Sequence, residues 1–258
     1  MLRFRSLGSG STGNATVIEA GNGLQTTRLL VDCGLGQKHL ETRLAAAGLA
    51  PDDIDAIFIT HEHADHIGCA RAWALRRRIP VWMSQGTHAA IGAPDFDGLL
   101  HLARDSQAIE VGELQLMPFT VPHDAREPLQ LVCSDGAVQL GILTDLGHAS
   151  AYVLQRLAGC HALLLECNHD PDLLAGGSYP PFLKRRVGGL WGHLANDAAA
   201  QIAQAVHHSG LKHVVAAHLS EQNNRPDLAR RAVAQALGCA DADIAVADAA
   251  GSGGWFSA

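Results

Sequence analysis

The sequence lacks the marks of a membrane, secreted or nucleic-acid-coating protein. No apolar run approaches the roughly 18 residues that a membrane-spanning helix requires, and the two arginines near the N-terminus are not followed by the apolar stretch of a secretory signal. With 19 basic and 26 acidic residues the net charge is −7, which argues against a surface that is basic overall and leaves room only for a local basic patch. We therefore expect a cytoplasmic protein with no membrane partner.

Closely spaced cysteines are lacking too. The six cysteines are scattered and form no Cys-x-x-Cys pair, and a chain of 258 residues that is 47% apolar can bury a sizeable core without cross-links. We expect reduced, mostly buried thiols rather than a disulfide framework. No linker or internal repeat divides the chain, so we predict a single domain over residues 1–258.

Short apolar runs alternate with helical patterns, which predicts an α/β fold in which helices cover the outer faces of sheets. The expected strands are residues 4–7, 15–19, 28–32, 54–60, 81–83, 113–121, 129–134, 137–144, 162–167, 214–217 and 244–247. The expected helices are residues 39–47, 66–78, 196–208 and 227–237. Residues 171–192 are rich in Gly and Pro, and we expect them to form a long structureless loop that acts as a lid or substrate loop.

Histidine is unusually abundant: the 15 histidines outnumber the 6 Phe, 2 Tyr and 4 Trp taken together. The densest group, His61-Glu-His63-Ala-Asp65-His66, lies between a predicted strand and a predicted helix start. Residues two apart in an extended segment point the same way, so His61 and His63 can bind one cation. Asp65 and His66 fall at the helix N-terminus, offset toward a second position. The group therefore favours a pair of metal ions, and a solvated polar loop is the alternative.

This His-x-His-x-Asp-His string resembles the signature of the metallo-β-lactamase fold. Other landmarks of that family match in the same order. Asp32 is an early Asp that closes a strand, and His123 is a His after a long strand. Asp145 is an Asp that ends the next hairpin, and His218 is a His that ends a late strand. The resemblance implies a four-layer αββα sandwich with a metal site along one edge.

The resemblance also implies the ligands of two metal ions. One ion has His61, His63 and His123, the other has Asp65, His66 and His218, and Asp145 is shared between them. Such ligands suit Zn²⁺ best and also accept Mn²⁺. Two ions roughly 3.5–4 Å apart activate a bridging hydroxide, so hydrolysis is the expected reaction.

Three further segments resemble the nuclease members of the family, ribonuclease Z and above all the YycJ/WalJ-like exonucleases. Residues 7–14 resemble their glycine-rich first loop, where backbone N–H groups can approach an anion. Residues 165–170 and 192–197 are similar to their Glu-Ser-Asn-His-Asp and Gly-His-Leu-Ser-Asn strings, with Cys167 and Ala195 in place of Ser, and residues 218–224 are close to His-Leu-Ser-x-x-Asn-Asn. This likeness covers nearly the whole chain and implies metal-dependent degradation of DNA, from the 5′ end.

The same resemblance suggests roles for individual residues. A Glu-oriented His would protonate the leaving oxygen, which gives Glu166 and His193 as catalytic candidates together with Asp65. The candidate substrate-binding residues are Ser9, Ser11, Asn14, His169, Lys184, Arg185, Asn196, Ser220 and Asn223. Structural interpretations stay open: a plain β-turn in the first loop, a helix cap at Asn196, and ordinary turn residues at 220–224.

Three other functions are alternatives for the same fold. A thioester or lactone hydrolase would not require the basic residues 184–186 or the Glu166–His193 pair. A catalytically silent member would bind nucleic acid or a protein, but such proteins typically lose ligands, and all seven ligand-type residues are present here. A di-iron oxygen-handling scaffold would normally need a flavin-bearing domain, for which this chain has no room. We therefore expect an exonuclease with DNA as its partner.

Overall fold

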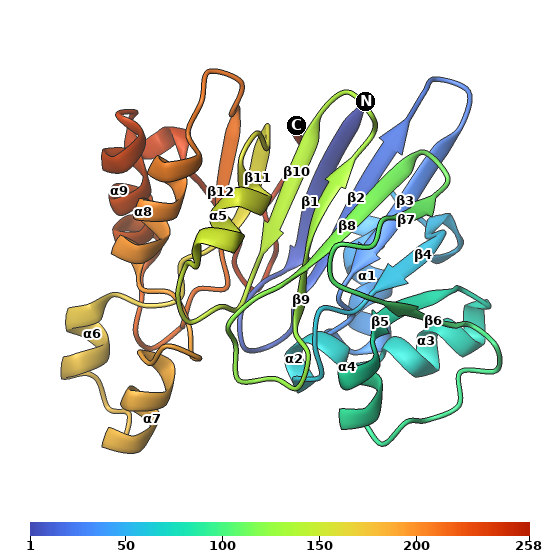
Figure 1. Cartoon of the computed structure of the whole chain (residues 1–258), viewed down its shortest axis with the longest axis horizontal. Coiled ribbons are helices and arrows are strands. Elements are labelled where there is room, and N and C mark those ends of the chain that lie inside the picture. Colours follow the sequence, from blue (N-terminus) through green and yellow to red (C-terminus); the bar gives the residue numbers. More distant parts are fainter.

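The structure, a computed structural model, describes all residues from 1 to 258 and contains two β-sheets of seven strands each (Figure 1). The first sheet consists of β1 (Leu2–Gly8), β2 (Ala15–Gly21), β3 (Thr26–Val31), β4 (Ala56–Phe58), β5 (Val81–Ser84), β6 (Leu100–Ala103) and β14 (Phe256–Ser257). The second consists of β7 (Ile109–Val111), β8 (Leu114–Thr120), β9 (Leu129–Ser134), β10 (Gln139–Leu143), β11 (Ala162–Glu166), β12 (His213–Ala217) and β13 (Ala245–Val246). Their spatial orders are β14-β1-β2-β3-β4-β5-β6 and β13-β12-β11-β10-β9-β8-β7.

Helices connect and cover these strands. They are α1 (Gln37–Ala46), α2 (Ala64–Ile67), α3 (Ala70–Arg77), α4 (Gln85–Ala90), α5 (Ala151–Leu157), α6 (Pro171–Gly176), α7 (Pro181–Val187), α8 (Asn196–Val206) and α9 (Pro226–Leu237). Short 3₁₀ turns lie at Pro51–Asp53 and Asp241–Asp243. None of the helices combines the length and apolar character needed to cross a membrane. All six cysteines are free, and four of them are buried.

Successive side chains of a strand point to opposite faces of its sheet, and both faces are buried here, which produces the four layers. In β3, Leu29 and Val31 belong to the core between the two sheets, whereas Leu30 faces the other side and packs in a cluster with Leu40 of α1 and Trp73 of α3. The outer face of the second sheet packs in the same way against α5, α8 and α9. The αββα sandwich expected from the sequence is confirmed, and Figure 1 shows its two sheets with helices outside them.

Strand direction brings the important loops to one edge. Strands β3 to β6 are parallel to one another, and so are β10 to β13. Strands β8 and β10 both pair antiparallel with β9, so they run in the same direction. Because the carboxyl ends of parallel strands meet at one edge, the segments after β4, β8, β10, β11 and β12 can meet there.

Residues 171–192 differ most from the expectation, because they contain α6 and α7 rather than a structureless loop. The side chain of Asp170 caps α6 by accepting hydrogen bonds from the backbone N–H groups of Asp172 and Leu173, and both helices have Pro in their first turn. The prediction of a loop was wrong because the Gly and Pro content masked these helix-start signals.

Smaller differences concern element boundaries. The predicted helix at 66–78 is split into α2 and α3 at Gly68, whose φ of 31° interrupts helical geometry. Strand β4 is shorter than the predicted 54–60. The short elements β6, β7, β14, α4 and α5 were not predicted, since each is too brief to show a clear period in the sequence.

Candidate metal centre

The candidate ligands follow the carboxyl ends of strands. His61 follows β4, His123 follows β8, Asp145 follows β10 and His218 follows β12. Two of these residues turn sharply out of their strands with left-handed backbones, Asp145 at φ 68° and His218 at φ 54°, and the supporting Asp32 does the same after β3 at φ 61°. Such φ values are uncommon for residues other than Gly and must be held by their surroundings. The sharp turns direct these side chains into the sheet edge.

The seven predicted ligands come together at this edge in two groups. The ligand atoms of the first group, His61, His63 and His123, lie within 4.8 Å of one another, and so do those of the second group, Asp65, His66 and His218. Asp145 lies between the groups: its Oδ1 is 3.9 Å from His123 Nε2, and its Oδ2 is 2.9 Å from His66 Nε2. This is the arrangement that the resemblance implied.

Hydrogen bonds fix the tautomers of His61 and His66. The hydroxyl of Thr60 donates to Asp32, so Thr60 Oγ1 accepts from Nδ1 of His61, 3.0 Å away. His61 Nε2 is consequently a buried lone pair without any hydrogen-bond partner. In the same way His66 Nδ1 donates to Asp32 Oδ2 over 2.7 Å, which leaves its Nε2 lone pair facing the Asp145 carboxylate. A nitrogen that faces a carboxylate in this way requires a positive charge at this position, supplied either by a proton on Nε2 or by a metal ion.

The same pattern recurs on the second sheet. His123 Nδ1 donates to the carbonyl oxygen of Gly192 over 3.0 Å, and His218 Nδ1 lies 3.1 Å from Glu166 Oε1. Both Nε2 atoms therefore face the centre, where the neutral imidazoles can bind a metal ion. An imidazole whose far nitrogen is held by an oxygen is the usual form of a metal-ligating histidine. The residues present thus fit a pair of divalent metal ions.

The electrostatics of the cluster agree with this fit. Burial, helped by the nearby His66, keeps the pKa of His61 well below its usual value, so its imidazole stays neutral and able to ligate. Burial also acts to lower the pKa of His66, but the carboxylates of Asp145 and Asp32 outweigh it and raise that pKa to about 10. The carboxylates therefore favour a positive charge at this position, which a metal ion supplies.

Two residues that were predicted to bind substrate form hydrogen bonds with candidate ligand residues. Ser9 Oγ accepts a hydrogen bond of 2.7 Å from the backbone N–H of His218. The backbone N–H of Asn14 donates to the carbonyl oxygen of Asp65 over 2.7 Å, and its side chain lies 3.1 Å from His66 Nε2. Of the first-loop candidates, only Ser11 lines the cavity beside the cluster.

Close packing under this loop gives a first prediction, for Gly34→Ala. A Cβ at Gly34 would lie 1.8 Å from the carbonyl oxygen of Asp65 and 2.8 Å from the backbone N of Asn14, so α2 must move. We expect the free energy of unfolding to fall by about 2 kcal/mol or more, measured in urea, together with weaker metal binding. Gly36→Ala is the matched control because no atom lies within 4 Å of its added Cβ; equal stability of the two variants would contradict the prediction.

Glu166, the last residue of β11, is fully buried and joins the cluster to His193. Its Oε1 accepts from His193 Nδ1 over 2.7 Å, and its Oε2 accepts from the backbone N–H groups of Leu146 and Leu194. Burial acts to raise the pKa of Glu166, but His193 outweighs it and lowers that pKa to about 2. Burial acts conversely to lower the pKa of His193, which the Glu166 carboxylate holds well above its usual value.

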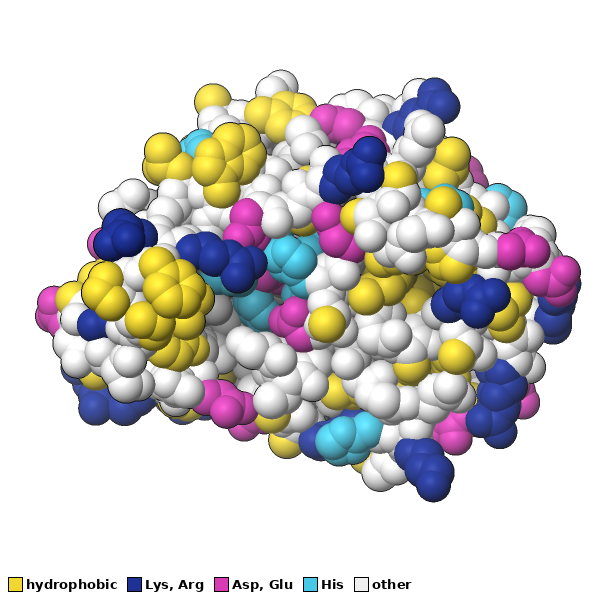
Figure 2. Space-filling model, turned by 90° about the horizontal axis from the view of Figure 1, so that it is seen from below, with side chains coloured by type: hydrophobic (Ala, Val, Ile, Leu, Met, Phe, Trp, Pro, Cys, Tyr) yellow, Lys and Arg dark blue, Asp and Glu magenta, His cyan; other side chains and the backbone are white.

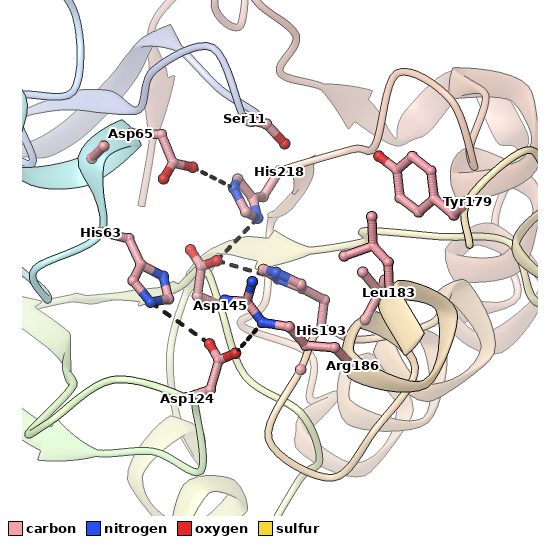
Figure 3. A pocket seen from close by; sticks show the side chains of 13 residues that line it. Ser11, His63, Asp65, Asp124, Asp145, Tyr179, Leu183, Arg186, His193 and His218 are labelled. Atoms are coloured by element: carbon pink, nitrogen blue, oxygen red, sulfur yellow. Dashed lines mark hydrogen bonds and ion pairs between the residues drawn. The ribbon is translucent and has the colours of Figure 1, made fainter. Parts of the chain in front are cut away.

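A cavity of about 360 Å³ opens over the cluster, between the metal-ligand residues and α7 (Figure 3). His193 lines it, with Nδ1 turned to Glu166, so Nε2 is the nitrogen left for the cavity. The wall from α7 includes Arg186, whose Nε donates to Asp124 Oδ2 over 2.6 Å. Asp124 Oδ1 in turn lies 3.7 Å from His63 Nε2.

Sequence reasoning missed part of this wall. Arg186 lines the cavity, whereas Lys184 and Arg185 do not; the Lys184 ammonium instead donates to the carbonyl oxygen of Ala175. The basic run was a visible signal, but only the orientation of α7 decides which cation faces the ligands. Asp124 was not selected either, although it lines the cavity and adjoins His123 in the sequence.

The remaining predicted substrate residues are buried beside the cavity and do not line it. Asn196 and Asn224 exchange hydrogen bonds of 2.9 Å through their side chains, and Asn196 does not cap α8, whose N-cap is Ala195. Ser220 Oγ accepts from the backbone N–H of Asn223. His169 is likewise buried, and its Nδ1 has no partner. Asn223 Oδ1 is a second buried polar atom of this group without a partner in the protein.

Known proteins are similar to this chain in sequence, and others are similar in fold. The family model described as "Metallo-beta-lactamase superfamily" matches residues 8–162. Exodeoxyribonuclease YycJ of Bacillus anthracis is 34% identical over 241 residues, covering 92% of this chain and 89% of that protein. Exodeoxyribonuclease WalJ of Streptococcus pneumoniae is 30% identical over 249 residues, covering 95% and 91%.

Among solved structures, the metallo-β-lactamase fold protein YhfI of Bacillus subtilis superimposes with a TM-score of 0.76, covering 100% of this chain and 99% of that one, at 15% identity. That likeness concerns the fold, whereas the two exodeoxyribonucleases are similar in sequence over nearly their whole lengths. The chain therefore belongs to the metallo-β-lactamase superfamily and, within it, to the family of the YycJ/WalJ exodeoxyribonucleases.

Proposed function

We propose that this protein is an exonuclease that hydrolyses the phosphodiester bonds of DNA from the 5′ end, with two divalent metal ions held by the seven side chains described above. Its family supports metal-dependent hydrolysis, and its exodeoxyribonuclease relatives support a DNA substrate. The observation that carries the proposal is the convergence of the seven ligand-type side chains on a cavity that also contains His193 and Arg186. A cytoplasmic location is part of the same proposal.

The donor set supports Zn²⁺ first and Mn²⁺ second, because five imidazoles and two carboxylates suit both ions. When bound, such ions supply an activated water at neutral pH and neutralise the charge that develops on the attacked phosphate. Asp145 links the two ligand groups through its contacts with His66 and His123. Asp65 lines the cavity and is assigned both as a ligand and as a proton acceptor beside the attacked phosphate.

His193 is assigned as the general acid. Its Nδ1 is bound to Glu166, so Nε2 can hold a proton toward the cavity and deliver it to the leaving oxygen of the cleaved bond. Glu166 is a positioning residue in this scheme, because its second oxygen is fixed by two backbone N–H groups and it contacts no part of the cavity. A leaving alkoxide needs such a proton far more than a thiolate does, which favours the phosphodiester over the thioester alternative.

The shape of the cavity supports removal of terminal nucleotides. A volume of about 360 Å³ lies in the range of sites for small ligands and suits one nucleotide better than a double helix. Helix α7 closes one side of the cavity, which supports entry of a strand by its end (Figure 3). We therefore assign residues 171–192 as the substrate segment, now as a pair of short helices.

End-labelled DNA tests this function directly. Protein loaded with Zn²⁺ or with Mn²⁺ is incubated with single- and double-stranded oligonucleotides that are labelled at the 5′ or the 3′ end. We expect the 5′ label to leave as a mononucleotide from the first time points, the 3′-labelled strand to shorten one nucleotide at a time, and EDTA to stop both. Internal cleavage, or no cleavage in either metal alongside turnover of a thioester or lactone, would contradict the proposal.

A further inference from the structure

Large apolar side chains are exposed beside the cavity, on α7 and the loop after it. Phe182 is 66% exposed, Leu190 68% and Trp191 61%, and α7 has no buried residue. The other exposed large apolar side chains, Met1, Leu24 and Leu102, lie on other elements. Figure 2 shows yellow side chains next to the hollow in which the histidines are visible. A cluster of this kind beside a candidate active site marks an interaction surface.

The same helix carries positive charge toward the hollow. Arg186 is held at the cavity by its Nε, which donates to Asp124, while its terminal amino groups have no hydrogen-bond partner in the protein. Dark blue side chains accordingly separate part of the apolar cluster from the hollow in Figure 2. A guanidinium fixed at one nitrogen and free at the other two is well placed to bind a phosphate group.

The loop that carries Trp191 is anchored to the rest of the site. His148 Nδ1 donates to the carbonyl oxygen of Leu190 over 2.9 Å, and the backbone N–H of His193 donates to Val187. The loop also packs so closely on Gly147 that a Cβ there would lie 2.2 Å from the Leu190 oxygen. The backbone on both sides of Trp191 is thus anchored, two residues before His193, while 61% of Trp191 is exposed.

We propose that this surface, Phe182, Arg186 and Trp191, binds the unpaired end of a DNA strand, with Arg186 on a backbone phosphate and the two aromatic rings stacked on bases. The inference rests on the proposed function and adds how the substrate is recognised. Aromatic rings with nearby cations bind single strands in a sequence-tolerant way, because every base has a face on which to stack. Inside an intact duplex those faces are covered by the neighbouring base pairs, so the surface favours an unpaired or frayed end.

A second copy of the chain is a weaker candidate for this surface. In a two-fold dimer the same patch meets itself, so the run Lys184, Arg185 and Arg186 would approach its own copy. Facing cations repel one another, whereas a DNA backbone complements them. The surface is also continuous with the cavity in which the phosphodiester would be cleaved, which a dimer interface would block.

Steady-state kinetics on a short single-stranded oligonucleotide test the inference with Trp191→Ala, Phe182→Ala and Arg186→Ala. We expect each variant to lose about tenfold in kcat/KM on the oligonucleotide, with unchanged turnover of bis(p-nitrophenyl) phosphate by the two aromatic variants. An oligonucleotide with abasic terminal positions should remove the difference between Trp191→Ala and the parent protein. Trp191→Phe should restore most of the loss. Leu24→Ala, 95% exposed on another element, and Arg231→Ala on α9 are the matched controls.

The outcomes separate this inference from the function on which it rests. If the aromatic variants match the parent protein on the oligonucleotide, the recognition surface is wrong while the exonuclease stands. If Trp191→Ala changes the molar mass in solution and leaves KM unchanged, the face is an interface between two copies, which also overturns the inference. If the parent protein cleaves neither the oligonucleotide nor bis(p-nitrophenyl) phosphate, the proposed function itself fails.

Discussion

Asp145→Asn is expected to lose at least about a thousandfold in phosphodiesterase activity, or about 4 kcal/mol of transition-state stabilisation, together with most of its bound metal. Asp145 is 1% exposed and reaches both ligand groups, with Oδ2 2.9 Å from His66 Nε2 and Oδ1 3.9 Å from His123 Nε2. The amide has nearly the same shape but no negative charge, and its N–H₂ group would point a donor where a metal ion needs an acceptor. Metal analysis of the purified protein and turnover of bis(p-nitrophenyl) phosphate measure the two losses.

The control for this change is Asp52→Asn, which removes a carboxylate that is 80% exposed and paired with Arg77 on the surface. We expect that variant to keep its metal and its activity. Circular dichroism should show that Asp145→Asn is folded, since the substitution leaves the packing volume unchanged. Full metal content and full activity in Asp145→Asn would remove this residue from the centre and end the two-ion assignment.

His193→Ala is expected to lower kcat on DNA by about a hundredfold to ten-thousandfold while the metal content stays unchanged. The physical reason is that the leaving oxygen of a nucleotide is strongly basic and must be protonated, and His193 lines the cavity with its Nδ1 bound to Glu166. Bis(p-nitrophenyl) phosphate has a leaving group that needs no proton. The loss should therefore shrink strongly on that substrate, a split that a merely structural role would not produce.

The variant His193→Asn distinguishes the proposed proton donation by His193 from its structural role as hydrogen-bond partner of Glu166. Its side-chain amide can still donate to Glu166, so the buried carboxylate keeps its partner while the proton donor facing the cavity is lost. We expect His193→Asn to be as slow on DNA as His193→Ala and nearly as stable as the parent protein. His101→Ala, which alters an exposed histidine stacked on Trp82, is the control and should be fully active. Equal losses on both substrates would refute the role as general acid.

The fold and the grouping of the ligands were predictable because both depend on local sequence patterns. Each of His123, Asp145 and His218 follows a run of apolar residues long enough to identify a strand, and strand ends of like direction meet at one edge. The spacing within residues 61–66 is equally local. These features need no knowledge of how distant side chains pack, and the structure places them as the sequence indicated.

The wall of the cavity could not be predicted. It depends on how α7 is rotated about its own axis and on hydrogen-bond partners that are distant in the sequence. Lys184, Arg185 and Arg186 are adjacent in sequence, but consecutive residues of a helix point in different directions, and only Arg186 meets Asp124. Ser9 and Asn14 belong to a loop whose composition suits an anion, yet their polar atoms are engaged by the backbone of His218 and Asp65. Composition indicated which groups were present but not which of them remained free.

The two sheets contribute unequal halves of the candidate metal centre, and this has a consequence for the lifetime of the protein. His61, His63, Asp65 and His66 follow a strand of the first sheet, while His123, Asp145 and His218 follow strands of the second. Bound ions would link the two sheets through their ligands. Ions present at a thousand times their dissociation constant would raise the free energy of unfolding by about 4 kcal/mol. In a cell short of metal the enzyme would therefore lose stability as well as activity. Proteolysis would then remove the metal-free molecules faster than the metal-bound ones.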